Sequence, residues 1–129
     1  MIEFIRSRIF SFRYAFSGWW YVIRTQRNAW IHALFSIIVI VVCLWLGLTA
    51  LEWALIIGAI AMVWTAEFIN TALEAMVDLA SPSRNHLARV SKDVGAAAVL
   101  IASLSAALIG LLVMGPPLLE RLGPLFGLR

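Results

Sequence analysis

Charged residues are scarce in this chain. They make up only 13% of its 129 residues, whereas hydrophobic residues make up 63%. An ordinary soluble domain has about 25% charged and about 45–50% apolar residues. Because a soluble protein of this size cannot bury so much apolar surface, we expect most of the chain to lie in lipid. The composition also excludes a disordered chain.

Cysteine is rare, and phosphate-binding glycine motifs are absent. Cys43 is the single cysteine, which excludes an internal disulfide and therefore a disulfide-stapled secreted domain. No glycine-rich phosphate loop, internal repeat or low-complexity tract is visible. The formal net charge of +3 is modest for a nucleic-acid binder, so no nucleic-acid partner is expected.

Three stretches are apolar enough to form transmembrane helices. At about 1.5 Å per residue, about 20 helical residues cross a hydrocarbon core about 30 Å thick. We predict spans over residues 29–50, 52–78 and 93–114, and we expect the Gly-Pro-Pro sequence at 115–117 to end the third. The apolar part of the middle stretch is too short alone, so its helix is expected to continue through a polar second half. Residues 1–115 then form one membrane domain, and residues 116–129 form a C-terminal tail.

Arginines are concentrated at the amino terminus. Residues 1–28 contain five arginines and one acidic residue, mixed with many aromatic side chains. This mixture is typical of an amphipathic helix in the membrane interface, which we place at residues 4–25. The link between the second and third spans also carries Arg84, Arg89 and Lys92, while the link between the first two carries no basic residue. The positive-inside rule therefore predicts a cytoplasmic amino terminus and an external C-terminal tail.

One polar stripe runs along the second half of the middle span. Its members recur at i, i+3, i+4, i+7 and i+11, so they share one face of a helix: Glu67, Asn70, Thr71, Glu74 and Asp78. The third span begins beside Lys92 and Asp93, at the same end of the bundle. Charged groups within a membrane are costly, so the stripe is not expected to face lipid.

Two interpretations of this stripe remain open from spacing alone. Carboxylate and amide oxygens bind Mg²⁺ together with substrate phosphates, a further carboxylate can accept a proton, and a lysine can neutralise phosphate oxygens. Together these groups could form a phosphoryl-transfer site. The alternative is an interhelical polar clamp that only holds the helices together. A transporter has less support, because the stripe stops at one end of the helices. His32, near the start of the first span, is interpreted as an interfacial hydrogen-bonding residue rather than a proton carrier.

The stripe belongs to a longer motif. The sequence Ala66-Glu67-Phe-Ile-Asn70-Thr-Ala-Leu-Glu74, followed by Lys92-Asp93-Val-Gly-Ala, resembles the small prokaryotic diacylglycerol kinase and undecaprenol kinase family. The resemblance extends from about Phe12 to about Leu112. The upstream motif Arg27-Asn28-x-x-Ile31-His32 resembles the undecaprenol kinase branch more than the diacylglycerol branch.

The resemblance implies a fold, a reaction and a set of site residues. The family is a homotrimer of three-helix subunits with an amino-terminal surface helix, and its active sites form between subunits at the cytoplasmic interface. Carried over by position, Glu67 would be the general base, Glu74 a magnesium ligand, and Asn70 a supporting residue. Gln26 takes the place of the family's second magnesium-binding glutamate. The positions that match nucleotide-binding residues are Lys92, Asp93, Tyr14, Ser83, Arg84 and Asn85.

The expected function is therefore that of a lipid kinase in the bacterial inner membrane. It would transfer a phosphoryl group from ATP, with Mg²⁺, to a membrane alcohol, with undecaprenol as the first choice and diacylglycerol as the alternative. A non-catalytic membrane subunit that keeps the kinase fold is the rival from another class. The features that favour this rival are Gln26 and the C-terminal tail.

Overall fold

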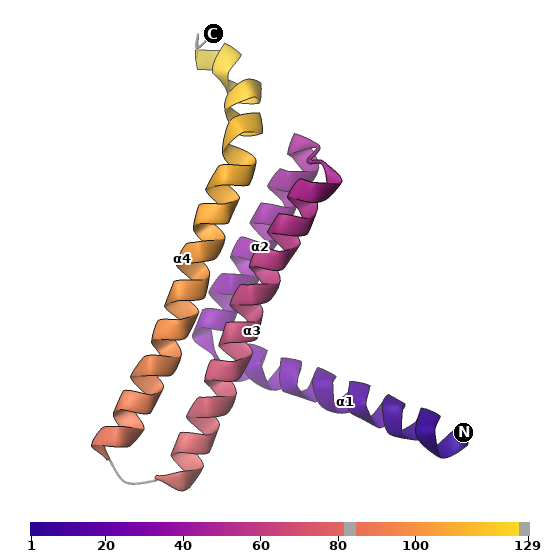
Figure 1. Cartoon of the computed structure of the whole chain (residues 1–129), viewed down its shortest axis with the longest axis vertical. Helices are drawn as coiled ribbons and strands as arrows, with labels where there is room; N and C mark the ends of the chain where they lie inside the picture. Colours follow the sequence, from indigo (N-terminus) through magenta and orange to yellow (C-terminus); the bar gives the residue numbers. More distant parts are fainter. Residues whose placement is uncertain (82–84, 127–129) are drawn as a thin grey trace.

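Every regular element of the described chain is a helix. The computed structural model describes residues 1–81 and 85–126, and the side chains within these ranges outside 2–9 and 125–126. The helices are α1 (Ile2–Thr25), α2 (Arg27–Leu46), α3 (Ala50–Ala80), α4 (His86–Leu122) and the short 3-10 helix η1 (Gly123–Phe126) (Figure 1). Of these, α2, α3 and α4 are long and apolar enough to cross a membrane. The predicted all-helical membrane class with three spans is confirmed.

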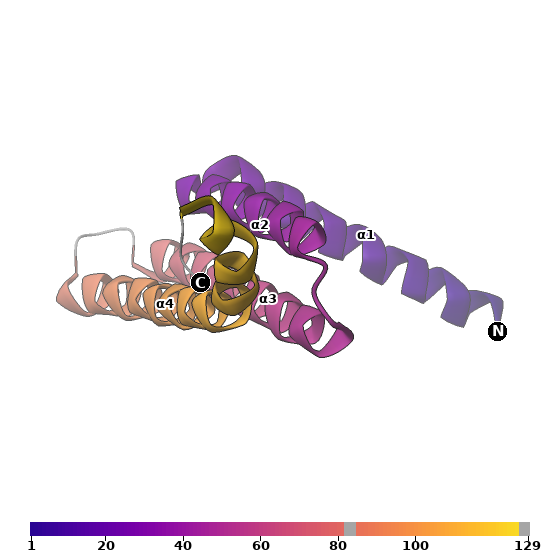
Figure 2. The same ribbon diagram turned by 90° about the horizontal axis from the view of Figure 1, so that it is seen from above.

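Helix α1 leaves the bundle sideways. Figures 1 and 2 show α2, α3 and α4 running alongside one another while α1 projects away from the start of α2. A single extended residue, Gln26, with φ −102° and ψ 116°, separates the two helices. Its N–H still donates to the carbonyl of Val22 (2.9 Å), which completes the last turn of α1. The change of direction therefore falls at Gln26 itself.

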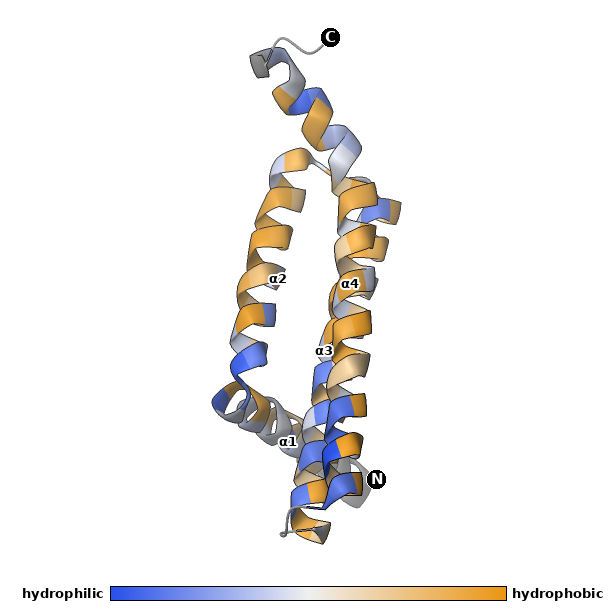
Figure 3. Ribbon diagram, turned by 90° about the vertical axis from the view of Figure 1, so that its left-hand side faces the viewer, coloured by the Kyte–Doolittle hydropathy of each residue, from blue (hydrophilic) through white to orange (hydrophobic). Residues whose placement is uncertain are grey.

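Aromatic contacts fix the level of α1 along the bundle. The ring of Trp19 in α1 packs against Trp64 and Phe68 of α3, with centroid distances of 4.8 and 4.9 Å. Gln26, directly after α1, contacts Glu74, so the carboxyl-terminal part of α1 lies beside the stretch of α3 from Trp64 to Glu74. Glu74 follows Glu67 by seven residues, so it lies about 10 Å farther along the helix axis, away from the apolar half. Figure 3 shows the hydrophilic residues of α3 and α4 gathered at this end.

Small residues let α3 and α4 pack closely. The buried residues of these helices include Ala59 on α3 and Gly95, Ala102 and Gly110 on α4. Between helices in lipid, close approach of small residues replaces much of the hydrophobic driving force. By contrast, α2 contacts α3 and α4 much less than these two helices contact each other. Helix α2 is therefore the more loosely held member of the bundle.

The turn from α2 to α3 is stabilised by its own polar groups. Gly47 ends α2 at φ +74°, a left-handed conformation that favours glycine. Thr49 then forms a capping box with Glu52: the Glu52 N–H donates to the Thr49 hydroxyl, and the Glu52 carboxylate accepts from the Thr49 N–H. At this end of the molecule each cap group has its partner.

The prediction that Gly-Pro-Pro ends the third helix is wrong. Helix α4 continues through Pro116 and Pro117 to Leu122. Each proline removes one backbone donor and crowds the preceding turn, but a bend can relieve the clash without ending the helix. Figure 3 shows the last turns of α4 leaning away from its main axis. The guanidinium of Arg121 lies 5.2 Å from the centroid of the Trp45 ring, and this contact holds the extension against α2.

Candidate active site

Three predicted site residues form one hydrogen-bonded cluster. The amide nitrogen of Gln26 donates to Glu74 Oε2 (3.2 Å), and the amide nitrogen of Asn70 donates to Glu74 Oε1 (3.1 Å). The extended residue between α1 and α2 thus reaches across to α3. The structure brings Gln26 to the carboxylate beside which the sequence motif places it, although 48 positions separate the two residues.

Glu67 is the most buried acidic residue of the stripe. Only 1% of the residue is exposed, and its carboxyl Oε2 has no hydrogen-bond partner. The atom opposite is Nε2 of His32 on α2, 3.9 Å away, which also lacks a partner. This distance is too long for a hydrogen bond. Two buried polar atoms therefore face each other at a distance that no hydrogen bond between described residues spans.

Asn70 is held against a glycine of the next helix. Its Oδ1 is buried and has no partner, while its nitrogen is used by Glu74. A Cβ on Gly95 would overlap this oxygen. The carboxamide therefore fits between α3 and α4 only because residue 95 has no side chain. Gly95 thus gives Asn70 a place between the two helices.

Lys92 reaches the stripe, whereas Asp93 turns away. The Lys92 ammonium forms an ion pair with Asp78, which links α4 to α3. Asp93 is instead paired with Arg89 of its own helix (3.8 Å), and its side chain is 71% exposed. Of the predicted Lys-Asp pair, only the lysine meets the acids of α3 within one chain.

Two of the remaining predicted nucleotide-binding residues lie within the described part of the chain, and neither forms a hydrogen bond with the cluster. Tyr14 is 72% exposed on α1. Asn85 caps the start of α4, where its side-chain oxygen accepts from the Leu87 N–H (2.9 Å). Ser83 and Arg84 lie outside the described residues. Asn85 thus has a local structural role that its sequence position did not reveal.

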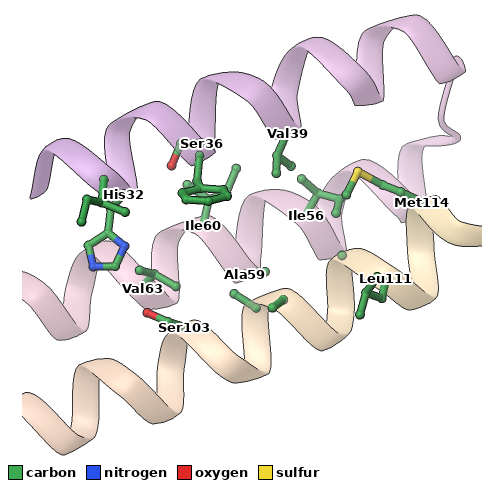
Figure 4. Close-up of a pocket in the computed structure, with 15 residues that line it drawn as sticks. His32, Ser36, Val39, Ile56, Ala59, Ile60, Val63, Ser103, Leu111 and Met114 are labelled. Atoms are coloured by element: carbon green, nitrogen blue, oxygen red, sulfur yellow. The ribbon is translucent and has the colours of Figure 1, made fainter. Parts of the chain in front are cut away.

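An apolar cavity of about 540 Å³ lies between the three spanning helices. It extends from His32 at one end to Met114 at the other, and its walls include Ile56, Ile60 and Val63 (Figure 4). Val63 precedes Glu67 by one turn of α3. The cavity therefore ends close to the buried carboxyl group.

The unpartnered atoms decide between a clamp and a binding site. A clamp that only joins helices is stable when its buried polar groups satisfy one another. Here His32 Nε2, Glu67 Oε2 and Asn70 Oδ1 remain without partners, although all three are buried. The Lys92–Asp78 pair does act as an interhelical clamp. The inner groups thus lack hydrogen-bond partners among the described residues, which favours a binding site over a clamp.

The comparisons with known proteins identify the family of this chain. The sequence model described as prokaryotic diacylglycerol kinase matches residues 13–114. The chain belongs to the prokaryotic diacylglycerol kinase family. The predicted resemblance is thus confirmed. The match includes every predicted site residue, from Tyr14 to Asp93. The C-terminal tail lies beyond it.

Individual relatives carry two different names. The chain is 40% identical to a diacylglycerol kinase of Synechocystis over 111 residues, which cover 85% of this chain and 63% of that protein. It is 35% identical to the undecaprenol kinase of Bacillus subtilis over 108 residues, or 84% of this chain and 88% of that protein. A diacylglycerol kinase of Escherichia coli is 36% identical over 83 residues, covering 59% and 68% of the two chains.

Sequence reasoning missed the position of His32. A lone histidine near the start of an apolar span gave no indication of its partner on another helix. The sequence held only part of the necessary information, namely that His32 follows Gln26 by six residues. In the structure Gln26 contacts Glu74, and His32 lies opposite Glu67 of the same stripe. Asp78 was recognised as part of the stripe, but its pairing with Lys92 depends on how α3 and α4 align.

The cluster offers ligands that fit a magnesium ion bound with a nucleotide. The described residues contain no group of three or more His, Cys, Asp or Glu side chains arranged to hold a metal alone. Mg²⁺ in phosphoryl-transfer sites is usually bound by one or two carboxylates together with substrate phosphates. Glu74 supplies a carboxylate, and a half-turn of the Gln26 carboxamide would present its oxygen where the nitrogen now lies. This donor set suits an ion that arrives with its phosphates.

Proposed function

We propose that this protein is a membrane lipid kinase that transfers the γ-phosphoryl group of ATP to the hydroxyl of a lipid alcohol. The observation that carries the proposal is the buried Glu67 carboxyl group, whose free oxygen faces His32 at the end of an apolar cavity. Membership of the diacylglycerol kinase family supports the same reaction class. Because a carboxylate in a dry site readily accepts a proton from an alcohol held against it, Glu67 suits the role of general base.

The proposed transfer is a single displacement. The alcohol oxygen forms a bond to the γ-phosphorus, the bond from that phosphorus to the bridging oxygen breaks, and ADP leaves with its electron pair. The hydroxyl proton passes to Glu67. Glu74, Asn70 and Gln26 would hold Mg²⁺, which when bound neutralises charge on the phosphate oxygens. Lys92 would bind phosphate by exchanging its contact with Asp78 for one with the nucleotide.

The site lies at a depth that both a membrane lipid and ATP from the water can reach. Trp19 of α1 packs against Trp64 and Phe68 of α3, and Gln26, directly after α1, contacts Glu74. Glu67 and Glu74 therefore both lie beside the carboxyl end of α1, with Glu74 nearer the polar end of α3. A lipid hydroxyl can reach Glu67 while its chain remains in the hydrocarbon core. ATP can reach Glu74 and Lys92 from the aqueous side. We place this side in the cytoplasm, because α1 and the start of α4 carry most of the basic residues.

Undecaprenol is the acceptor that we favour. The motif Arg27-Asn28-x-x-Ile31-His32 supports this choice, since it resembles the undecaprenol kinase branch. The Bacillus subtilis relative bears that name. Diacylglycerol is the second candidate, supported by the names of the Synechocystis and Escherichia coli relatives.

We further propose that the working enzyme is a homotrimer in the bacterial inner membrane. A single chain leaves Tyr14 exposed and Asp93 turned away from the cluster. A site formed between subunits could bring these residues to the nucleotide of a neighbouring chain. Cross-linking in native membranes tests this assembly: a ladder that ends at three chains supports it, and a chain that stays monomeric contradicts it.

A mixed-micelle assay tests the function directly. The purified protein is given MgATP with undecaprenol and diacylglycerol in parallel, and lipid phosphate is measured. We expect faster phosphorylation of undecaprenol. A preference for diacylglycerol would make diacylglycerol, and not undecaprenol, the favoured acceptor. A folded protein that binds nucleotide but phosphorylates neither lipid would support the non-catalytic subunit instead.

A further inference from the structure

His32 and Glu67 contribute a pair of buried atoms that no described residue bridges. His32 Nε2 and Glu67 Oε2 are 3.9 Å apart, and both lack a hydrogen-bond partner. An oxygen atom beside the line between them can lie about 2.7–3.0 Å from each, within hydrogen-bonding distance of both. An alcohol suits this position because it can accept a hydrogen bond from the imidazole N–H and donate one to the carboxyl oxygen.

The His32 ring is fixed in place by neighbours. Trp64 of α3 meets the imidazole edge-on, with a centroid distance of 6.4 Å. The indole is itself held: its N–H donates to Ser36 Oγ (3.2 Å), and Trp19 packs against it from α1. The side chain of His32 is only 16% exposed. A polar ring that is supported so closely is prepared to orient a ligand rather than to contact solvent.

The cavity indicates what kind of ligand reaches the pair. His32 lies at its end near Glu67, while most of the wall is apolar side chains (Figure 4). Figure 4 shows the imidazole turned into the space between α2 and α3, near Val63. Of the polar residues in the wall, Ser36 is already engaged by Trp64. One apolar chain with a single terminal hydroxyl matches this distribution of polar and apolar groups.

We propose that His32 binds the oxygen of the acceptor alcohol and turns its hydroxyl hydrogen toward Glu67. The inference rests on the proposed lipid kinase activity and adds a substrate-binding residue to it. His32 Nε2 donates to the alcohol oxygen, the alcohol donates to Glu67 Oε2, and the chain of the lipid lies in the cavity. His32 contributes to the lipid step and not to nucleotide binding, because the nucleotide ligands cluster around Glu74 one or two turns away.

Three substitutions at this position separate a specific hydrogen bond from a structural role. His32→Gln retains an amide N–H close to the place of Nε2, whereas His32→Asn carries its N–H closer to the place of Nδ1. His32→Leu keeps similar bulk without a donor. Thr65→Val provides the control, since Thr65 lies on α3 two residues before Glu67 and its side chain is exposed.

The assay uses the full-length protein in mixed micelles with undecaprenol and MgATP. We expect His32→Leu and His32→Asn to lower kcat/KM for the lipid about 10- to 100-fold, with the affinity for nucleotide unchanged. His32→Gln should recover most of the loss, and Thr65→Val should behave as wild type. Nucleotide binding by each variant shows that it is folded. If His32→Leu does not fold, the comparison of the Gln and Asn variants decides the question.

Failures of the two proposals are distinguishable. A wild-type protein that phosphorylates no lipid alcohol refutes the proposed function, and the role of His32 with it. An active wild type whose His32→Leu variant keeps its kcat/KM within twofold refutes the role of His32 alone. Equal activity of the Gln and Asn variants would show that the position needs only polarity, and it would also overturn the assignment to Nε2.

Discussion

The two ends of the helical bundle use similar residues in opposite ways. At the turn between α2 and α3, Glu52 and Thr49 exchange hydrogen bonds, and each polar group of the cap has its partner. At the other end, Glu67 lies deeper than Glu52 and keeps a carboxyl oxygen without a partner. His32 Nε2 and Asn70 Oδ1 also lack a hydrogen-bond partner among the described residues. One end uses its carboxylate to stabilise the fold, and we propose that the other keeps its carboxyl group available for a substrate.

The contrast has an energetic consequence. A cap hydrogen bond contributes about 1 kcal/mol to stability. A buried polar group that lacks a partner costs about 1–3 kcal/mol. Functional sites commonly sacrifice stability in this way. Substitutions at the two ends should therefore separate activity from stability, and the following predictions are ordered from the largest expected effect to the smallest.

Glu67→Gln should lower kcat for lipid phosphorylation about 100- to 10,000-fold, because the amide cannot accept the hydroxyl proton. Nucleotide affinity should change little, since Glu74 and not Glu67 adjoins Gln26 and Asn70. Steady-state kinetics and nucleotide titration of one preparation measure both quantities. If the variant kept its kcat, Glu67 would not be the general base.

Gly95→Ala should disrupt the site from the neighbouring helix. The added Cβ overlaps Asn70 Oδ1, so the carboxamide must move and the support for Glu74 is lost. Displacement of a positioned group by about 1 Å can lower the rate about 100-fold. Gly58→Ala is the matched control, because a Cβ there has no atom within 4 Å. Equal activity of the two variants would mean that Asn70 is not held by this contact.

Gln26→Glu should raise the apparent affinity for Mg²⁺ severalfold. A dication gains more from a carboxylate than from an amide, above all where the dielectric constant is low. Without metal, the new carboxylate repels Glu74 and loses the hydrogen bond that Gln26 donates. Turnover at saturating Mg²⁺ should change less than the half-saturating concentration. Superimposable titrations of the two forms would show that residue 26 does not face the ion.

Thr49→Ala should affect stability alone. Loss of the capping box removes about 1 kcal/mol and lowers the midpoint of thermal unfolding. The site lies at the other end of α3, so kcat should stay within twofold of wild type. A large loss of activity in this variant would show that the two ends are coupled, and the contrast between them would no longer hold.

The sequence predicted the elements of the fold better than the contacts between them. Hydropathy revealed the three spans, since about 20 apolar residues have few alternatives to crossing a membrane. Proline at 116 and 117 suggested a helix end that the structure replaces with a bend, because the contact of Arg121 with Trp45 depends on how α4 lies beside α2. Local rules therefore failed where a distant residue supplied the support.

The candidate site was predicted as a stripe and not as a three-dimensional arrangement. Helical spacing placed Glu67, Asn70 and Glu74 on one face, and the family motif added Gln26. The position of His32 opposite Glu67 depends on the register between α2 and α3, which no pattern within either helix specifies. The contact of Asn70 with Gly95 likewise depends on how α3 and α4 align, so it could be found only in the structure.

Thermal unfolding of Glu67→Gln, without metal, nucleotide or lipid, tests the central claim most directly. If the buried carboxyl group is kept for a substrate, replacing it with a neutral amide removes the cost of burying a charge there. The account predicts an unfolding midpoint equal to or above that of wild type in a variant that has lost lipid phosphorylation. A midpoint well below wild type, with phosphorylation retained, would show that Glu67 holds the helices together, and it would contradict the account.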